Sequence, residues 1–186
     1  MHNNINQLIS IQKEIQTKII ELNYKDYNPK IIAVSKTFSM SEILPLINHG
    51  HKDFGENKVQ EAIEKWTDIK KDFTDINLHM IGKLQTNKVK YVIPLFDYIH
   101  SLDNFNLAKK ISQEQKKKNK NEKIFIQINI GNEKQKSGID IGSLKDFYST
   151  CVNELQLNII GLMCIPPQNE DINSHFKKMS EIQKSI

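Results

Sequence analysis

Hydrophobic positions along the chain follow two different periods. Near the N-terminus, apolar residues recur every three or four positions, a spacing that predicts an amphipathic helix. These residues are Ile5, Leu8, Ile11, Ile15, Ile19 and Leu22. After Asn28-Pro29, the segment KIIAVS at 30–35 is a short apolar run, which predicts a buried strand. The same change from a helical period to a short apolar run recurs along the rest of the chain.

Six predicted strands are each followed by a segment of helical character. The predicted strands are 30–35, 51–55, 77–82, 96–101, 123–131 and 157–165. The helices predicted after them are 41–48, 57–66, 86–92, 104–118, 141–152 and 172–186. Short buried strands that alternate with helices indicate a parallel sheet in an α/β domain.

Two parallel architectures fit this alternation: an open, doubly wound sheet and a closed barrel. No glycine-rich loop follows the first strand, so the dinucleotide-binding signature of many open sheets is missing. A TIM-type (β/α)8 barrel needs eight units, and six are predicted here. We therefore expect such a barrel with about six of its eight units present, and residues 1–186 as a single, truncated barrel domain.

Composition and charge narrow the possible partners. The chain has 186 residues, 38% of them hydrophobic, which is enough for one core. Its net charge is a modest +4, and every basic residue is lysine, so arginine's bidentate recognition of phosphates and carboxylates is absent. The lysine-rich run at 116–123 has no interleaved aromatic residues, which favours a solvated helix end. We expect no nucleic-acid partner.

Cysteines, histidines and apolar runs give no sign of a metal, disulfide or membrane. Cys151 and Cys164 form no CxxC pair, and the six histidines lack the spacing of metal ligands. The first ten residues are polar, unlike the apolar core of a signal peptide. No apolar run approaches the roughly 20 residues that span a bilayer. The sequence predicts a cytoplasmic protein without a metal site.

Ligands of parallel α/β proteins bind at the carboxyl ends of the strands. The residues expected there are Lys36, Glu56, Asn57, His79, Gly82, Lys83, His100, Ser101, Asn129, Lys136, Met163 and Cys164. A lysine that is partly desolvated and close to other ammonium groups loses its proton more easily, and its free amine can attack a carbonyl to form a Schiff base. The residues alone leave open a sugar phosphate or the aldehyde of pyridoxal phosphate (PLP).

Structural explanations compete with a binding role for two of these residues. Asn57 with Gln60 forms a capping-box pattern at the start of a predicted helix, and capping alone would explain it. His79 lies on an apolar strand, where a histidine is often a hydrogen-bonded core residue. We expect His100 to be structural.

Five motifs stand in order along residues 30–167. They are AVSKT at 33–37, FGENKVQE at 54–61, HMIGKLQTNK at 79–88, QINIGNEKQKSGI at 127–139 and GLMCIP at 161–166. Together they resemble the YggS/PROSC family of PLP homeostasis proteins. The resemblance implies a barrel of PLP fold type III, similar to the N-terminal domain of alanine racemase. It also implies a protein that binds PLP without catalysis of its own.

The resemblance also implies roles for individual residues. Lys36 would hold PLP as a Schiff base, and Asn57, His79 and Met163 would line the pocket. Lys136 matches a family lysine to which no role is assigned. Family members continue with two further strands whose loops, including an arginine, surround the phosphate, and these segments have no counterpart here. The chain is then either a fragment or a barrel without high-affinity binding.

Further expectations concern partners and alternative activities. Apo forms of PLP-dependent enzymes are candidate recipients, and the full-length family form is expected to be monomeric. A PLP-dependent amino-acid racemase or decarboxylase is the main alternative. In alanine racemase a second domain supplies the opposing acid–base tyrosine, and nothing here matches it. A cofactor-free Schiff-base lyase fits less well, because its lysine usually lies on a later strand.

Overall fold

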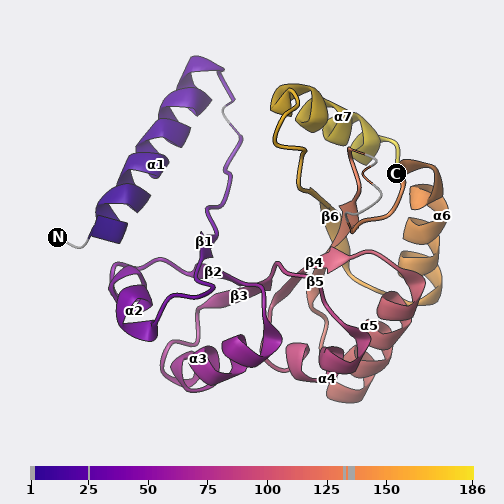
Figure 1. The fold of residues 1–186 in the computed structure, drawn as a ribbon, viewed down its shortest axis with the longest axis horizontal. Coiled ribbons are helices and arrows are strands. Elements are labelled where there is room, and N and C mark those ends of the chain that lie inside the picture. Colours follow the sequence, from indigo (N-terminus) through magenta and orange to yellow (C-terminus); the bar gives the residue numbers. More distant parts are fainter. Residues whose placement is uncertain (1–2, 25, 132, 134–136) are drawn as a thin grey trace.

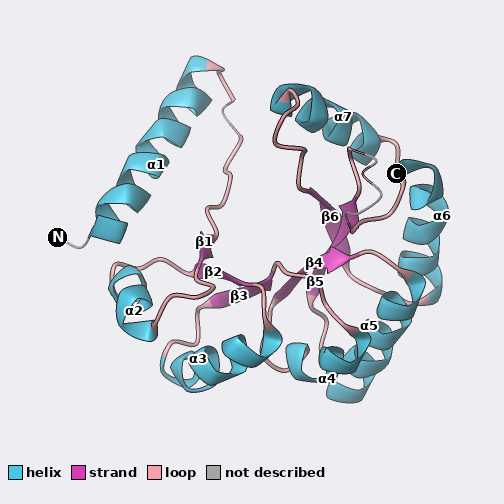
Figure 2. Ribbon diagram, in the orientation of Figure 1, coloured by secondary structure: helices cyan, strands magenta, loops and turns pink. Residues whose placement is uncertain are grey.

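Six parallel strands form a single sheet in the protein (Figure 2). The structure is a computed structural model, and it describes residues 3–24, 26–131, 133 and 137–186. The strands are β1 (Ala33–Val34), β2 (Asp53–Glu56), β3 (Asn77–Met80), β4 (Tyr98–Leu102), β5 (Lys123–Ile128) and β6 (Ile159–Cys164). Each strand lies beside its predecessor, in the order β1-β2-β3-β4-β5-β6, and every pair is parallel.

This strand order differs from that of a doubly wound sheet, one of the two architectures considered from the sequence. A doubly wound sheet reverses its order at a switch point, whereas here each new strand is added on the same side. The predicted α/β class with six strands is confirmed. Within the described residues the sheet is not closed, because β1 pairs only with β2 and β6 only with β5.

The helices lie mainly on the outer side of the curved row of strands (Figure 1). The α-helices are α1 (Asn3–Glu21), α2 (Met40–Asn48), α3 (Val59–Asp72), α4 (Val89–Val92), α5 (Phe105–Lys118), α6 (Leu144–Ser149) and α7 (Ile172–Lys184). Three short helical segments are η1 (Thr86–Lys88), η2 (Ile141–Ser143) and η3 (Thr150–Glu154). α2 to α6 follow the outside of the sheet, while α1 and α7 stand at its two ends.

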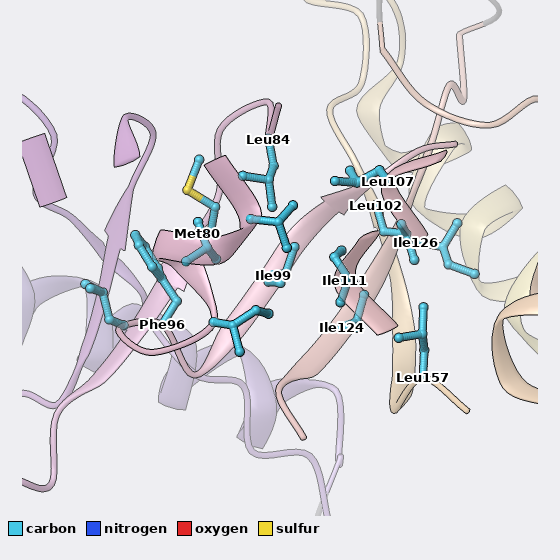
Figure 3. Packing of buried hydrophobic residues seen from close by; sticks show 14 of the residues in the cluster. Met80, Leu84, Phe96, Ile99, Leu102, Leu107, Ile111, Ile124, Ile126 and Leu157 are labelled. Carbon is cyan, nitrogen blue, oxygen red and sulfur yellow. The ribbon is translucent and has the colours of Figure 1, made fainter. Parts of the chain in front are cut away.

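The hydrophobic core fills the space between the strands and this outer layer of helices (Figure 3). Alternate strand residues supply it, because successive side chains of a strand point to opposite faces. Phe54, Met80, Ile99 and Ile124 come from neighbouring strands, and all four are fully or almost fully buried. Burying such side chains contributes about 1.5–3 kcal/mol each to folding. The core thereby fixes which strand residues face away from the helices.

The opposite face of the sheet carries polar and aromatic side chains. Asp53, His79, Tyr98 and Lys123 occupy paired or adjacent register positions on β2 to β5. His79 stacks on Tyr98 with 4.2 Å between ring centroids, and the Lys123 ammonium contacts the Tyr98 hydroxyl at 3.1 Å. We refer to this side of the sheet as the inner face.

Several helix and strand boundaries differ from the sequence prediction, those of β1 among them. β1 is limited to Ala33–Val34, although the apolar run predicted a strand over 30–35. As an edge strand it has only one neighbour with which to pair. Pro45 lies in the middle of α2, beyond the first turn where proline is best tolerated. No helix in the described part of the chain is long and apolar enough to cross a membrane.

Candidate functional site

Of the four candidate residues, His79 and Met163 lie within strands on the inner face, and Lys36 and Asn57 follow the ends of β1 and β2. Gly55 pairs with Val34 and with His79, so these three positions share one row and one face. Lys36 and Asn57 come two residues after the paired Val34 and Gly55, beyond the last register pair of β1 and β2. Met163 lies on β6, the last strand of the sheet, where it pairs with Gln127 of β5. Lys36 and Asn57 therefore follow the carboxyl ends of two paired strands, whereas Met163 lies on the strand at the other edge of the sheet.

Lys36 lies in the turn that follows β1. Its side chain is exposed, and its ammonium has no hydrogen bond or ion pair within the described residues. Ser35, directly before it, is buried and turns the other way, because its hydroxyl donates to Glu56 Oε1 at 2.8 Å. Lys36 follows Ser35 at the start of this turn, and its own side chain makes none of these contacts with the helix side. An exposed amine at a strand end is available to react.

Asn57 follows β2 and has an unusual environment. Its Oδ1 atom is buried and has no hydrogen-bond partner among the described residues. Most buried polar atoms in proteins have a partner, so an orphan of this kind needs an explanation. A ligand that donates a hydrogen bond here would remove the cost of about 1–3 kcal/mol that an unpaired buried acceptor carries.

The sequence prediction that Asn57 caps a helix is wrong. α3 begins at Val59, its N-cap is Lys58, and no side chain caps it. The backbone of Asn57 instead lies against Gly82, the last residue of the HMIG motif. A Cβ atom at Gly82 would lie 2.3 Å from the Asn57 carbonyl oxygen. Only glycine permits this close approach, which holds Asn57 against the end of β3.

His79 is part of a hydrogen-bonded chain on the inner face. Its Nε2 atom lies 3.1 Å from Asp53 Oδ1, and its Nδ1 atom lies 2.9 Å from His100 Nε2. Because the Asp53 carboxylate only accepts, His79 donates to it from Nε2 and accepts from His100 at Nδ1. Both nitrogens of His79 are therefore occupied, and a ligand can meet only the remaining edge or face of the ring.

His100 should make the protein less stable in mild acid. Desolvation, with His79 nearby, lowers its pKa from 6.5 to about 4. The unfolded chain binds a proton at this residue below about pH 6.5, whereas the folded chain does not until about pH 4. The free energy of unfolding should thus fall by about 2 kcal/mol between about pH 7 and about pH 5. Urea denaturation of wild type and His100→Gln would measure this.

The His100→Gln variant serves as the internal reference, because other groups also titrate in this range. Glutamine keeps an amide donor for His79 but does not titrate. The variant should show a pH dependence smaller by that amount. Identical pH dependence in the two proteins would contradict the assignment.

A pocket of about 350 Å³ opens at the ends of β3, β5 and β6. Its volume lies within the usual range for small-molecule sites. Lys83, Gln127, Asn129 and Ser137 are its polar lining residues, and Lys36 and Asn57 are not part of the lining. Asn129 holds the loop after β5 in place: its amide donates to the Glu133 carbonyl at 2.9 Å and its Oδ1 accepts from the Glu133 amide at 3.1 Å.

Several residues expected at the strand ends take other positions. Glu56 was expected there, but it faces the helices and is fully buried, because the even–odd phase of β2 is set by Phe54 in the core. Cys164 pairs with Ile128, whose side chain is in the core, so it also lies on the helix side. Lys136 falls outside the described residues. Nothing in the sequence predicted that Glu56 would be buried and would bind the hydroxyl of Ser35, the residue before Lys36.

Known proteins similar to this chain identify its family. The family described as "Alanine racemase, N-terminal domain" matches residues 14–185. The pyridoxal phosphate homeostasis protein of Aquifex aeolicus is 36% identical over 84% of this chain and 69% of its own length. The protein of the same name from Buchnera aphidicola is 39% identical over 88% of this chain and 72% of its own. The chain belongs to the YggS/PROSC family of pyridoxal phosphate homeostasis proteins.

Solved structures agree with this assignment. PipY of Synechococcus elongatus matches with a TM-score of 0.78 at 29% identity without PLP, covering 90% of this chain and 82% of PipY. With PLP bound it matches with a TM-score of 0.77 at 28% identity, covering 90% and 80%. An alanine racemase from Clostridium difficile has a TM-score of 0.61 at 16% identity, covering 87% and 42%, and shows the fold alone.

Proposed function

We propose that this protein binds PLP at the carboxyl ends of its strands and contributes to PLP homeostasis, with Lys36 as the residue that captures the cofactor. Membership of the family supports this proposal, as does the similarity to PipY, which has been solved with PLP bound. The observation that carries it concerns two residues at the carboxyl ends of β1 and β2: within the described part of the chain, neither the Lys36 amine nor the buried Oδ1 of Asn57 has a hydrogen-bond partner.

The residues at this site fit the aldehyde-bearing half of the cofactor. When bound, PLP offers an aldehyde carbon that forms a C=N bond with a free amine and releases water. The Lys36 nitrogen would make that bond, after losing its proton to solvent. Asn57 Oδ1 would accept a hydrogen bond from a hydroxyl or protonated ring nitrogen. We infer that Met163, on the same face, contributes apolar surface to the wall of the site.

The phosphate half of the cofactor has fewer obvious partners. Lys83 is exposed and lines the pocket at the ends of β3, β5 and β6. It is a single cation of the kind that binds phosphate as a point charge. Since the sequence contains no arginine, bidentate recognition is not available. We therefore propose that most of the affinity comes from Lys36 and the ring contacts.

We infer that the bound cofactor is held rather than used for catalysis. His79 and Tyr98 are the inner-face groups best suited to proton transfer. His79 is hydrogen-bonded to Asp53 and His100, and Tyr98 to Lys123. A racemase or decarboxylase needs an acid–base group free to act on the substrate. The family name given to the relatives supports a carrier role as well.

We propose that the curved sheet is the six-strand part of a TIM-type barrel of PLP fold type III, and that residues 1–186 act as one binding unit. Strands added in chain order on one side, with helices outside, support this view. Two free thiols, Cys151 and Cys164, support a reducing, cytoplasmic location. Apo enzymes that require PLP are the recipients we propose.

Titration of the protein with PLP tests this function. The visible absorbance of the Schiff base should rise and saturate at one cofactor per chain. Pyridoxamine phosphate, which lacks the aldehyde, is the control and should give no such band. Incubation of the loaded protein with L- and D-alanine should give no racemisation beyond that of free PLP. A rise that never saturates would overturn the proposed binding, and turnover would support the racemase alternative.

A further inference from the structure

Three charged side chains on the helix side of the sheet form hydrogen bonds with the residues before and after Lys36. They are Glu56 at the end of β2 and Glu61 and Lys65 on α3, and we call them the Lys65 cluster. The Lys65 ammonium lies 2.7 Å from Glu56 Oε1 and 2.9 Å from Glu61 Oε1. Its side chain is only 13% exposed, and that of Glu56 is fully buried. An ion pair in such surroundings is screened little by solvent and needs good geometry to repay its desolvation.

Lys65 bonds to the main chain before and after Lys36. Its ammonium donates to the Ser35 carbonyl at 2.8 Å and to the Phe38 carbonyl at 3.3 Å. The Lys65 ammonium group thus links the two carbonyls that flank the turn containing Lys36. Because Lys65 extends from a rigid helix, its contacts fix the turn relative to α3.

Glu56 fixes the residue that precedes Lys36. Its Oε1 atom accepts from the Ser35 hydroxyl at 2.8 Å and from the Trp66 indole N–H at 3.0 Å. The Ser35 amide also donates to the Gly55 carbonyl at 2.9 Å. Ser35 is thereby held on the helix side of the sheet, immediately before Lys36.

Glu61 fixes the residue that follows Lys36. The Thr37 amide donates to Glu61 Oε1 at 2.7 Å. Thr37 has a φ of 66°, a left-handed conformation that costs a β-branched residue energy. The bonds from Lys65 and from the Thr37 amide lower the pKa of the Glu61 carboxyl. A charged acceptor therefore stabilises a strained turn at the position next to Lys36.

If the Lys65 cluster had a purely structural role, its contacts would not affect the reaction of Lys36 with PLP. α3 offers a direct comparison in Lys70, whose ammonium donates to the Leu95 carbonyl at 3.0 Å and to Asp97 Oδ2 at 2.5 Å. Its side chain is 18% exposed, much as that of Lys65. The Lys70–Asp97 ion pair holds the residues just before β4. These lie at the amino end of that strand, whereas Lys36 follows the carboxyl end of β1. The two lysines are similarly buried, but Lys65 has two carboxylate and two carbonyl partners where Lys70 has one of each, and they hold different segments.

We propose that the Lys65 cluster is a positioning device for Lys36. It fixes residues 35, 37 and 38 so that the Lys36 amine is presented on the inner face beside Asn57. This inference rests on the proposed function, since it concerns capture of PLP by Lys36. Lys65, Glu56 and Glu61 are positioning residues, because they act on Lys36 through its neighbours and do not contact the ligand.

Site-resolved trapping tests the proposal. Wild type, Lys65→Met, Glu61→Ala and Lys70→Met are incubated with PLP, reduced with borohydride, and digested for mass-spectrometric mapping. Borohydride delivers hydride to the C=N carbon and fixes the cofactor as a secondary amine. Lys65→Met should slow labelling of Lys36 by about tenfold or more, because small errors of position are costly. Labelling of exposed lysines elsewhere should not change.

Two controls separate positioning from folding. Lys70→Met should match wild type at Lys36 even if it lowers the melting temperature as much as Lys65→Met does. Glu61→Ala alters a half-exposed helix position, where alanine favours the helix, so it should fold normally and still slow labelling several-fold. Lys65→Arg, which keeps the charge and donors, should recover part of the rate.

Each outcome has a distinct meaning. Selective labelling of Lys36 in wild type, with equal rates in Lys65→Met and Glu61→Ala, overturns the positioning role and leaves the proposed function standing. Equal losses in Lys65→Met and Lys70→Met also overturn it, because the effect would then be general destabilisation. If Lys65→Met does not fold, Glu61→Ala decides. Even labelling of all lysines in wild type overturns the proposed function itself.

Discussion

Lys36→Ala is expected to abolish the visible Schiff-base band and to leave no cofactor trapped at the site. The reason is chemical: in the proposed site Lys36 provides the amine, and alanine cannot form the C=N bond. The expected loss exceeds that of any neighbouring substitution, because neighbours change the rate of capture while Lys36 provides the reacting atom. Absorbance titration followed by borohydride reduction and intact-mass measurement would show it.

Lys109→Ala is the matched control for this experiment. Lys109 is exposed on α5, on the outer side of the sheet, so its loss removes one lysine without touching the inner face. It should retain the full band and one trapped cofactor. A Lys36→Ala protein that still saturates with one cofactor would show that another lysine is the acceptor.

Trp66→Ala is expected to have the largest effect on stability. The indole is fully buried and packs against Phe54 with 5.0 Å between ring centroids. It also donates to Glu56 Oε1, so its removal leaves a cavity and takes one partner from a buried carboxylate. We expect a loss of about 3–5 kcal/mol in the free energy of unfolding, measured by urea denaturation. For a typical domain this is a large share of the total.

Trp66→Phe divides this effect into its two parts. Phenylalanine fills much of the volume but has no N–H group, so the loss of the Glu56 hydrogen bond remains. Trp66→Phe should lower the free energy of unfolding much less than Trp66→Ala does. Thr67→Ala, at the exposed next position on α3, should change stability by only about 0.5 kcal/mol or less. If Trp66→Ala were no more destabilising than Thr67→Ala, the packing described here would be wrong.

Much of the fold follows from local patterns. Short segments between helical patterns located the six strands, although residues 51–55 contain a single large apolar side chain, and the three-to-four spacing located the first helix. These signals depend only on which residues are buried, and each strand carries its own. Parallel pairing in chain order then follows from the short βα repeat. Closure of the sheet does not follow, since it depends on contacts between the first and last strands.

The arrangement of the candidate site was harder to predict from the sequence than the fold. The position of Lys36 just after the first strand was predictable, because a charged residue follows an apolar run, while its role in binding stays a prediction. Glu56 was not, because both faces of a parallel strand are buried and the sequence gives no phase for its side chains. Its partner Lys65 lies on a helix where a lysine predicts only solvent. The Asn57 capping pattern was misleading, because a tertiary contact with Gly82 replaced the expected local one.

The most direct test of the account is a crystal structure of this chain grown with PLP. We predict continuous electron density from Lys36 Nζ to the aldehyde carbon of the cofactor, with Asn57 Oδ1 at hydrogen-bonding distance from a cofactor donor. The turn at residues 35–38 should keep its contacts with Lys65. Cofactor density joined to a different lysine, or lying on the helix side of the sheet, would contradict the central claim.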